Sequence, residues 1–125
     1  MNSIAQAAAI AALEGIGYYR DIWNRIARER EYMAKRLSEL KDIEIFPSST
    51  NFLLINVSRC RESPTKIYDK LVQRKILILP SWSIDFSGLG KGFFRILVGT
   101  REENDKFITE LGKVLSDCKR GKLCY

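Results

Sequence analysis

The sequence predicts an α/β domain in which helices cover a small, mostly antiparallel sheet, with the element order ααββαββα. Three observations support this fold class. Apolar residues recur at helical spacing near both ends of the chain, short β-rich segments fill the middle, and turn-forming residues separate these segments. The chain has 125 residues, of which 46% are hydrophobic. This size and composition are typical of one compact unit with one hydrophobic core.

The beginning of the chain predicts two helices rather than one. Residues 3–40 have helical character almost throughout, but Gly15 and Gly17 fall within one turn, where helix propensity is poorest. We therefore expect helices at 3–13 and 18–40. The first is rich in alanine, so its backbone is suited to lie close against another element. The second carries apolar residues at helical spacing, at Ile22, Ile26, Met33, Leu37 and Leu40.

The middle of the chain predicts a strand pair, a helix and a further strand. β-rich segments at 43–46 and 52–57 are separated by a run of turn-forming residues. Ser63 and Pro64 then supply a cap and a first-turn proline for a helix that ends near Arg74. The next strand is expected at 76–79.

The last part of the chain predicts a loop, a strand and a helix. Residues 80–92, rich in serine and glycine, form the loop, and loops of this length within a compact domain are usually functional or mobile. The strand 93–98 follows. Thr100 and Glu103 have the spacing of a capping box at the start of a helix. The apolar face of that helix consists of Phe107, Ile108, Leu111 and Leu115.

Two aromatic residues in the predicted loop, Trp82 and Phe86, have two interpretations. They can line a binding pocket, or they can attach the loop to the core. The sequence does not distinguish between these two roles.

The charge pattern favours a solvated surface. The formal net charge is +6, but most basic residues alternate with acidic ones, as at 28–31, and only the tail 119–125 is basic without acids. A nucleic-acid interface normally gathers its basic residues with aromatics, so nucleic acid is not the favoured partner. No secretory leader and no apolar stretch long enough to span a bilayer is present, so we expect a cytoplasmic protein and no membrane.

The cysteines predict reduced thiols and no metal site. The chain has three cysteines, Cys60, Cys118 and Cys124, and no histidine. A zinc ion normally takes four ligands, and two thiolates so far apart are a weak signal. Whether Cys118 and Cys124 begin a metal-binding tail stays open.

Arg95 is the candidate binding residue. It interrupts an apolar strand, and an unpaired guanidinium is costly to bury. It therefore either reaches solvent or pairs with an anion, for which a carboxylate is the best bidentate partner. Asn51, just before the strand 52–57, is a second candidate, because its amide can bind the same ligand or simply complete the turn. Without histidine, a phosphate-cradling loop or paired carboxylates, the sequence predicts no catalytic residue.

Three motifs in the same order resemble a known family. They are NSIAQAAA at 2–9, PSSTNF at 47–52 and FRILVGTREEN at 94–104. Together they resemble the C-terminal small domain of fold-type I aminotransferases that depend on pyridoxal 5'-phosphate, in the group of histidinol-phosphate aminotransferase and threonine-phosphate decarboxylase. The stretch 87–90 is similar to the decarboxylases, which implies a lyase of cobalamin biosynthesis rather than a transferase of amino-acid biosynthesis.

The resemblance implies a role for the chain within a larger parent enzyme. It makes Arg95 the anchor of the substrate carboxylate and places Asn51 and Phe52 near the substrate side of the domain interface. It implies an interdomain helix region at 1–17, a small domain at 18–118 that closes over the substrate, and a basic tail at 119–125. The partners it implies are a large domain that holds pyridoxal 5'-phosphate, an amino-acid phosphate substrate and, for the parent, a second subunit in a homodimer.

The resemblance also predicts that this chain is a fragment that is inactive alone. The family's Schiff-base lysine follows a serine, and no lysine in this chain does so. Two alternatives remain open. One is a small basic α/β module that binds nucleic acid, and the other is a domain that binds an amino-acid ligand without any reaction.

Overall fold

The computed structural model describes residues 2–83 and 88–119, and it confirms the predicted order of elements. The elements are α1 Ser3–Glu14, α2 Ile16–Ser38, β1 Glu44–Phe46, β2 Phe52–Asn56, α3 Pro64–Gln73, β3 Leu79–Pro80, β4 Phe93–Leu97 and α4 Arg101–Lys119. The four strands form one sheet in the order β1-β2-β4-β3, and every neighbouring pair is antiparallel. The α/β fold class is therefore confirmed.

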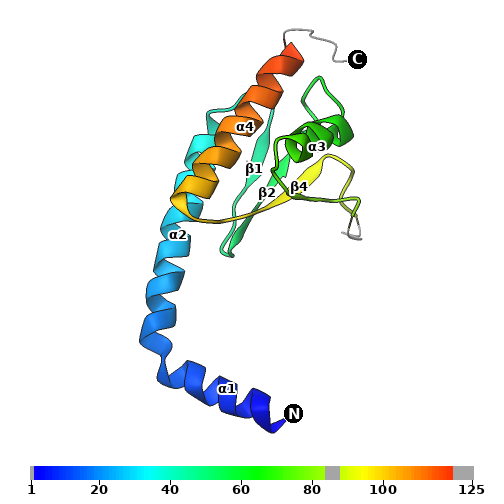
Figure 1. Cartoon of the computed structure of the whole chain (residues 1–125). Helices are drawn as coiled ribbons and strands as arrows, with labels where there is room; N and C mark the ends of the chain where they lie inside the picture. Colours follow the sequence, from blue (N-terminus) through cyan, green and yellow to red (C-terminus); the bar gives the residue numbers. More distant parts are fainter. Residues whose placement is uncertain (1, 84–87, 120–125) are drawn as a thin grey trace.

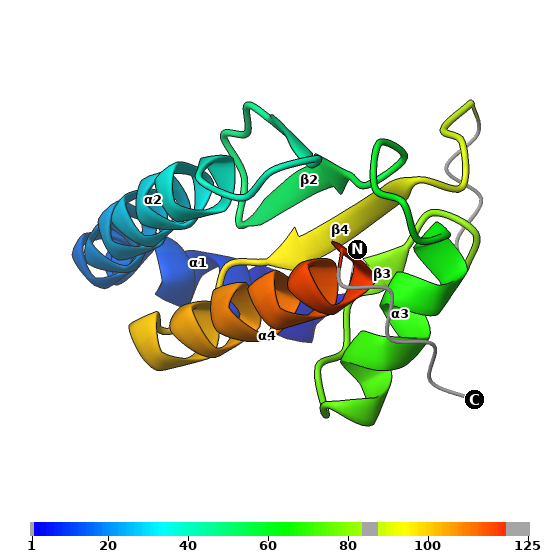
Figure 2. The ribbon, with the colours of Figure 1, turned by 90° about the horizontal axis from the view of Figure 1, so that it is seen from above.

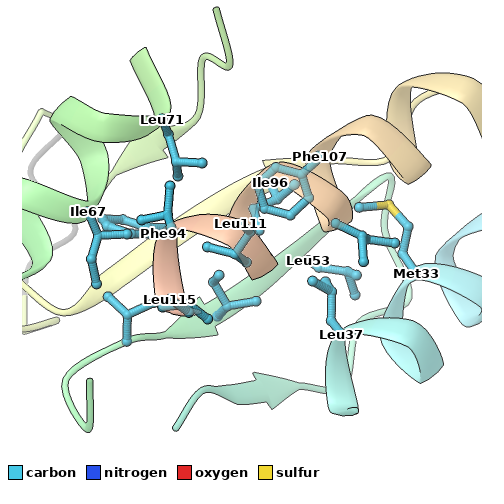
Figure 3. Close-up of a cluster of buried hydrophobic side chains, with 14 of the residues drawn as sticks. Met33, Leu37, Leu53, Ile67, Leu71, Phe94, Ile96, Phe107, Leu111 and Leu115 are labelled. Carbon is cyan, nitrogen blue, oxygen red and sulfur yellow. The ribbon is translucent and has the colours of Figure 1, made fainter. Parts of the chain in front are cut away.

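Helices α2, α3 and α4 cover one face of the sheet (Figures 1 and 2). Side chains alternate along a strand, and on β2 and β4 every second side chain is buried beneath these helices. Figure 3 shows how residues from the three helices and the two central strands meet in one cluster. Its largest fully buried members are Phe94, Met33, Leu37, Leu53, Ile55, Ile67, Leu71 and Leu111.

The opposite face of the sheet carries no buried side chain among the described strand residues. Its residues are half-buried or exposed, and Leu97 is 66% exposed. From the strand registers, this open face consists of Glu44, Phe46, Phe52, Leu54, Asn56, Leu79, Phe93, Arg95 and Leu97.

The predicted break between the first two helices is confirmed at Gly15. The N–H of Gly15 bonds to the C=O of Ala11 at 3.0 Å, and Gly15 serves as both the C-cap of α1 and the N-cap of α2. The chain changes direction here, so α1 runs at an angle to α2. Together, α1 and the first half of α2 project from the sheet (Figure 1). No residue of α1 is buried.

The two predicted helix caps are also confirmed. The Ser63 hydroxyl accepts a bond from the N–H of Lys66 at the start of α3. At α4 the N–H of Thr100 donates to Glu103 Oε2 at 2.8 Å, and the N–H of Glu103 donates to Thr100 Oγ1 at 3.4 Å. The reciprocal pair is the capping box that the sequence predicted.

The third strand differs from the prediction, because it covers Leu79–Pro80 instead of 76–79. Helix α3 ends in a left-handed turn at Lys75, whose φ is +60°, and the N–H of Ile76 still bonds to the C=O of Leu71 in that helix. The chain therefore reaches β4 only at Leu79, which pairs with Arg95.

Candidate functional site

Arg95 lies in the middle of the open face, on a strand with neighbours on both sides. It pairs with Leu54 of β2 and with Leu79 of β3, and Leu54 pairs in turn with Phe46 of β1. These four residues form one row across the sheet. The Arg95 side chain is half-buried and shares its face with apolar side chains.

The guanidinium of Arg95 stacks on an aromatic ring. Its Cζ atom lies 4.0 Å from the ring centroid of Phe52, well within the range of a cation–π interaction. Within residues 2–83 and 88–119, Arg95 makes no ion pair or hydrogen bond through this group. By contrast, Arg74 donates to Glu110 at 2.8 Å and to Asp117 at 3.3 Å.

One member of this row, Phe46, forms an aromatic pair on the same face. The rings of Phe46 and Phe93 have centroids 5.8 Å apart. Together with Phe52, they make the surroundings of Arg95 largely apolar. An anion that reached the guanidinium would therefore meet few competing protein acceptors among the described residues of this face.

Asn51 lies at the start of β2 and bonds the end of β4 through its backbone. Its C=O accepts from the N–H of Val98 at 2.9 Å, and its side chain is exposed. By strand alternation Asn51 has the parity of the buried Leu53, whereas Arg95 shares a face with Leu54. A shared ligand for Asn51 and Arg95 stays a prediction.

Trp82 attaches the loop after β3 to the core. Its ring makes edge contacts with Tyr68 of α3 and with Phe94 of β4, each with centroids 5.7 Å apart. These contacts favour attachment of the loop to the core over the lining of a binding pocket. Phe86 and Ser87 lie outside the described residues.

A polar cluster that the sequence analysis missed joins α2 to the start of α4. Arg101 donates to both carboxylate oxygens of Glu29, with its Nη2 at 2.8 Å from Oε1 and its Nε at 3.0 Å from Oε2. Asn104, only 2% exposed, donates from Nδ2 to Glu29 Oε2 at 3.1 Å. Asn104 occupies the apolar stripe of α4 that continues through Phe107, and this polar residue at a core position was the available signal.

Hydrogen bonding in this cluster shifts the acidity of both charged groups. The bond from Arg101, reinforced by the bond from Asn104, holds the pKa of Glu29 below its ordinary value, and the same pairing raises the pKa of Arg101. The Arg101 guanidinium also lies over the ring of Tyr32, 3.5 Å from its centroid. The Tyr32 hydroxyl in turn donates to Asp105.

A hollow of about 580 Å³ beside this cluster has basic and acidic residues in its lining. Its position at the start of α4 would suit an anion. However, the N–H groups of Gly99 and Thr100 are already bonded to the side chains of Asn104 and Glu103. The polar groups of the cluster therefore hydrogen-bond with one another, and the cluster joins α2 to α4.

The described residues show neither a metal site nor a membrane span. No group of three or more His, Cys, Asp or Glu side chains among them is arranged to hold a metal ion. None of the helices in this part of the chain is long and apolar enough to cross a bilayer. The thiol of Cys60 donates to the C=O of Asp42 at 3.2 Å. The side chain of Cys118 and all of Cys124 lie outside the described residues.

Comparison with known proteins assigns the family. The sequence profile named "Aminotransferase class I and II" matches residues 1–111. The chain belongs to this aminotransferase family. Its members use pyridoxal 5'-phosphate.

Curated relatives of this chain include two histidinol-phosphate aminotransferases. "Histidinol-phosphate aminotransferase 2" of Archaeoglobus fulgidus is 33% identical over 106 residues, which are 85% of this chain and 29% of the relative. The enzyme of Clostridium kluyveri is 33% identical over 115 residues, 92% of this chain and 30% of the relative. The chain thus spans about 30% of the length of these relatives.

Solved structures agree with this assignment. The histidinol-phosphate aminotransferase of Sinorhizobium meliloti, in complex with pyridoxal-5'-phosphate, matches with a TM-score of 0.74 and 25% identity, over 94% of this chain and 31% of that one. The L-threonine-O-3-phosphate decarboxylase of Porphyromonas gingivalis shares the fold, with a TM-score of 0.67 and 22% identity, over 74% of this chain and 28% of that one.

The described residues of this chain do not by themselves fit the cofactor. A lysine that forms a Schiff base needs a desolvated amine with a lowered pKa. Among the lysines whose exposure the structure describes, all are exposed except Lys70, which is half-buried and pairs with Glu62 at 2.8 Å. No described lysine therefore has the environment that this chemistry needs.

Proposed function

We propose that this chain is the substrate-closing part of a pyridoxal-phosphate-dependent enzyme, in which Arg95 binds the carboxylate of the substrate. The observation that carries the proposal is the environment of Arg95. Its guanidinium is half-buried on an open sheet face, stacks on Phe52 at 4.0 Å, and has no acceptor among the described residues. Such a group is suited to donate two parallel hydrogen bonds to a planar anion such as a carboxylate.

The parent enzyme that we propose is a histidinol-phosphate aminotransferase or a threonine-phosphate decarboxylase acting in the cytoplasm on the phosphate ester of an amino alcohol or an amino acid. The named relatives and their length support a larger parent. In this proposal the remaining part of the parent supplies the cofactor site and the Schiff-base lysine, so this chain is inactive alone. The parent acts as a homodimer.

Exposed apolar side chains on the projecting helices support a further protein surface in the parent. Ile4 is 78%, Leu13 is 69% and Trp23 is 54% exposed. Large apolar side chains this exposed on a projecting element are suited to pack against another protein surface. We assign it to the contact with the large domain that holds the cofactor.

The test replaces Arg95 in the complete protein to which this sequence belongs. Arg95→Ala should raise KM for the amino-acid substrate about 10- to 150-fold, because a charge-assisted bond contributes about 1.5–3 kcal/mol. The absorbance of the bound cofactor should stay unchanged. Arg61→Ala, at an exposed position away from the open face, is the control. Unchanged kcat/KM in the Arg95→Ala protein, with cofactor bound, would exclude the proposed role.

A further inference from the structure

Phe52 and Arg95 are diagonal neighbours on two paired strands. Phe52 pairs with Leu97, and Arg95 pairs with Leu54. Both side chains therefore emerge on the open face, two positions apart across the β2–β4 ladder. Diagonal pairs at this separation come within reach when the side chains are long or aromatic.

The ring of Phe52 limits where the guanidinium of Arg95 can go. The Cζ atom lies over the ring at 4.0 Å from its centroid. An arginine side chain normally loses considerable rotamer freedom when it binds a ligand, and this loss weakens binding. A stack against a ring that the strand holds in place removes part of that freedom beforehand.

The stack also leaves the donors of the guanidinium available. The N–H groups of a guanidinium point outward from Cζ in one plane, so a single ring 4.0 Å from Cζ cannot occupy all five donors. Within the described residues no acceptor takes these donors. The edge of the group is therefore free for the two parallel bonds that a carboxylate accepts.

We propose that Phe52 is a positioning residue, whose ring holds the Arg95 guanidinium in the orientation that receives a carboxylate. This inference rests on the proposed function of Arg95. Phe52 itself touches the arginine and not the ligand. Loss of its ring should weaken carboxylate binding about 2- to 10-fold, the range expected from a partly exposed cation–π contact.

Four substitutions separate positioning from a general effect on the sheet. Phe52→Leu removes the ring and keeps an apolar side chain, and Phe52→Tyr keeps the ring. Phe46→Leu is the matched control, because Phe46 lies on the same face but its ring contacts Phe93. Arg95→Lys removes the planar guanidinium with its parallel N–H donors and keeps the positive charge.

The first measurement follows the Nε–Hε signal of Arg95 in the ¹⁵N-labelled 125-residue chain, assigned by its loss in Arg95→Lys. Protons held over a ring are shielded. Phe52→Leu should therefore move this signal downfield, while Phe52→Tyr and Phe46→Leu should leave it in place.

The second measurement titrates each protein with sodium acetate, a simple carboxylate, against sodium chloride at equal ionic strength. The Arg95 signal should shift with acetate and saturate. Phe52→Leu should raise the acetate Kd about 2- to 10-fold, whereas Phe52→Tyr and Phe46→Leu should stay within about twofold of wild type, since neither removes the stacked ring.

The outcomes distinguish the inference from the proposed function. If acetate binding depends on Arg95 but Phe52→Leu binds as wild type does, positioning is wrong and the role of Arg95 stands. An equal loss in Phe52→Leu and Phe46→Leu also overturns positioning, because it indicates a general change of the face. If acetate moves the Arg95 signal no more than chloride does, the proposed function fails for this chain, and the inference fails with it.

Discussion

Asn104 and Gly99 form a closed pair of hydrogen bonds at the end of β4. The N–H of Gly99 donates to Asn104 Oδ1 at 2.9 Å, and Asn104 Nδ2 donates back to the C=O of Gly99 at 3.1 Å. The same nitrogen also reaches Glu29 of α2. One buried side chain therefore fixes the turn between β4 and α4 and connects that turn to a third element.

Asn104→Ala should destabilise the chain by about 1–3 kcal/mol, because it leaves buried polar groups of the turn without partners. The loss should appear as a lower midpoint in urea unfolding followed by circular dichroism. Asn24→Ala, at an exposed position on α2, is the matched control and should stay within about 0.5 kcal/mol of wild type. Equal midpoints for the two variants would contradict the role of Asn104.

Glu29→Gln should make the chain less stable at pH 7 but not at low pH. The native pKa of Glu29 is below its ordinary value of 4.5, chiefly because of the bond from Arg101. A carboxyl with a lowered native pKa stabilises the fold above its unfolded pKa, and this contribution disappears as the pH falls through the native pKa. The difference in melting temperature between wild type and Glu29→Gln should therefore be largest near pH 7 and shrink below pH 4.5.

The control for this pH dependence is Glu31→Gln, an exposed position on the same helix. Both variants should still lose stability in acid, because the bond from Thr100 lowers the pKa of Glu103, and bonds from Lys113 and Arg74 lower the pKa of Glu110. A difference between wild type and Glu29→Gln that stays constant from pH 7 to pH 3 would refute the assignment.

Gly92→Ala should destabilise the chain by about 1–3 kcal/mol through overpacking. A Cβ atom at this position would lie 1.8 Å from Ser58 Oγ and 2.8 Å from Asn56 Oδ1. The close approach exists because the C=O of Gly92 accepts from the N–H of Val57 at 2.9 Å, which extends the β2–β4 ladder.

A double-mutant cycle in urea unfolding checks this contact. Ser58→Ala removes the nearer oxygen and should recover part of the loss in the Gly92→Ala background, with a coupling of at least about 0.5 kcal/mol. Additive effects of the two substitutions would show that Ser58 is not the obstacle.

The sequence predicted local features of the fold well and distant contacts poorly. The paired Gly15 and Gly17, the Ser63 cap and the Thr100 capping box depend on residues close together in the chain, and each was predicted correctly. The Glu29 cluster depends on partners 72 and 75 residues away. No local pattern encodes such a contact, so only the polar residue in the stripe of α4 indicated it.

The candidate site shows the same division. The position of Arg95 in an apolar strand was visible in the sequence, whereas its stack on Phe52 depends on the register between β2 and β4. A shift of one residue in that register would place the two side chains on opposite faces. The strand β3 was predicted with the wrong bounds, because its start depends on the left-handed turn at Lys75, and lysine is not a residue type that indicates this conformation.

The projecting helix α1 means that one unfolding free energy does not describe the whole chain. This helix has 12 residues and none of them is buried, and helices this short are marginal in water without packing. Its amide hydrogens should exchange with solvent through local fraying, whereas the amide hydrogens of β2 should exchange only when the whole fold opens. Hydrogen exchange should therefore run from fast at α1 to slow at the central strands, and a heated sample should lose helix signal before the sheet melts.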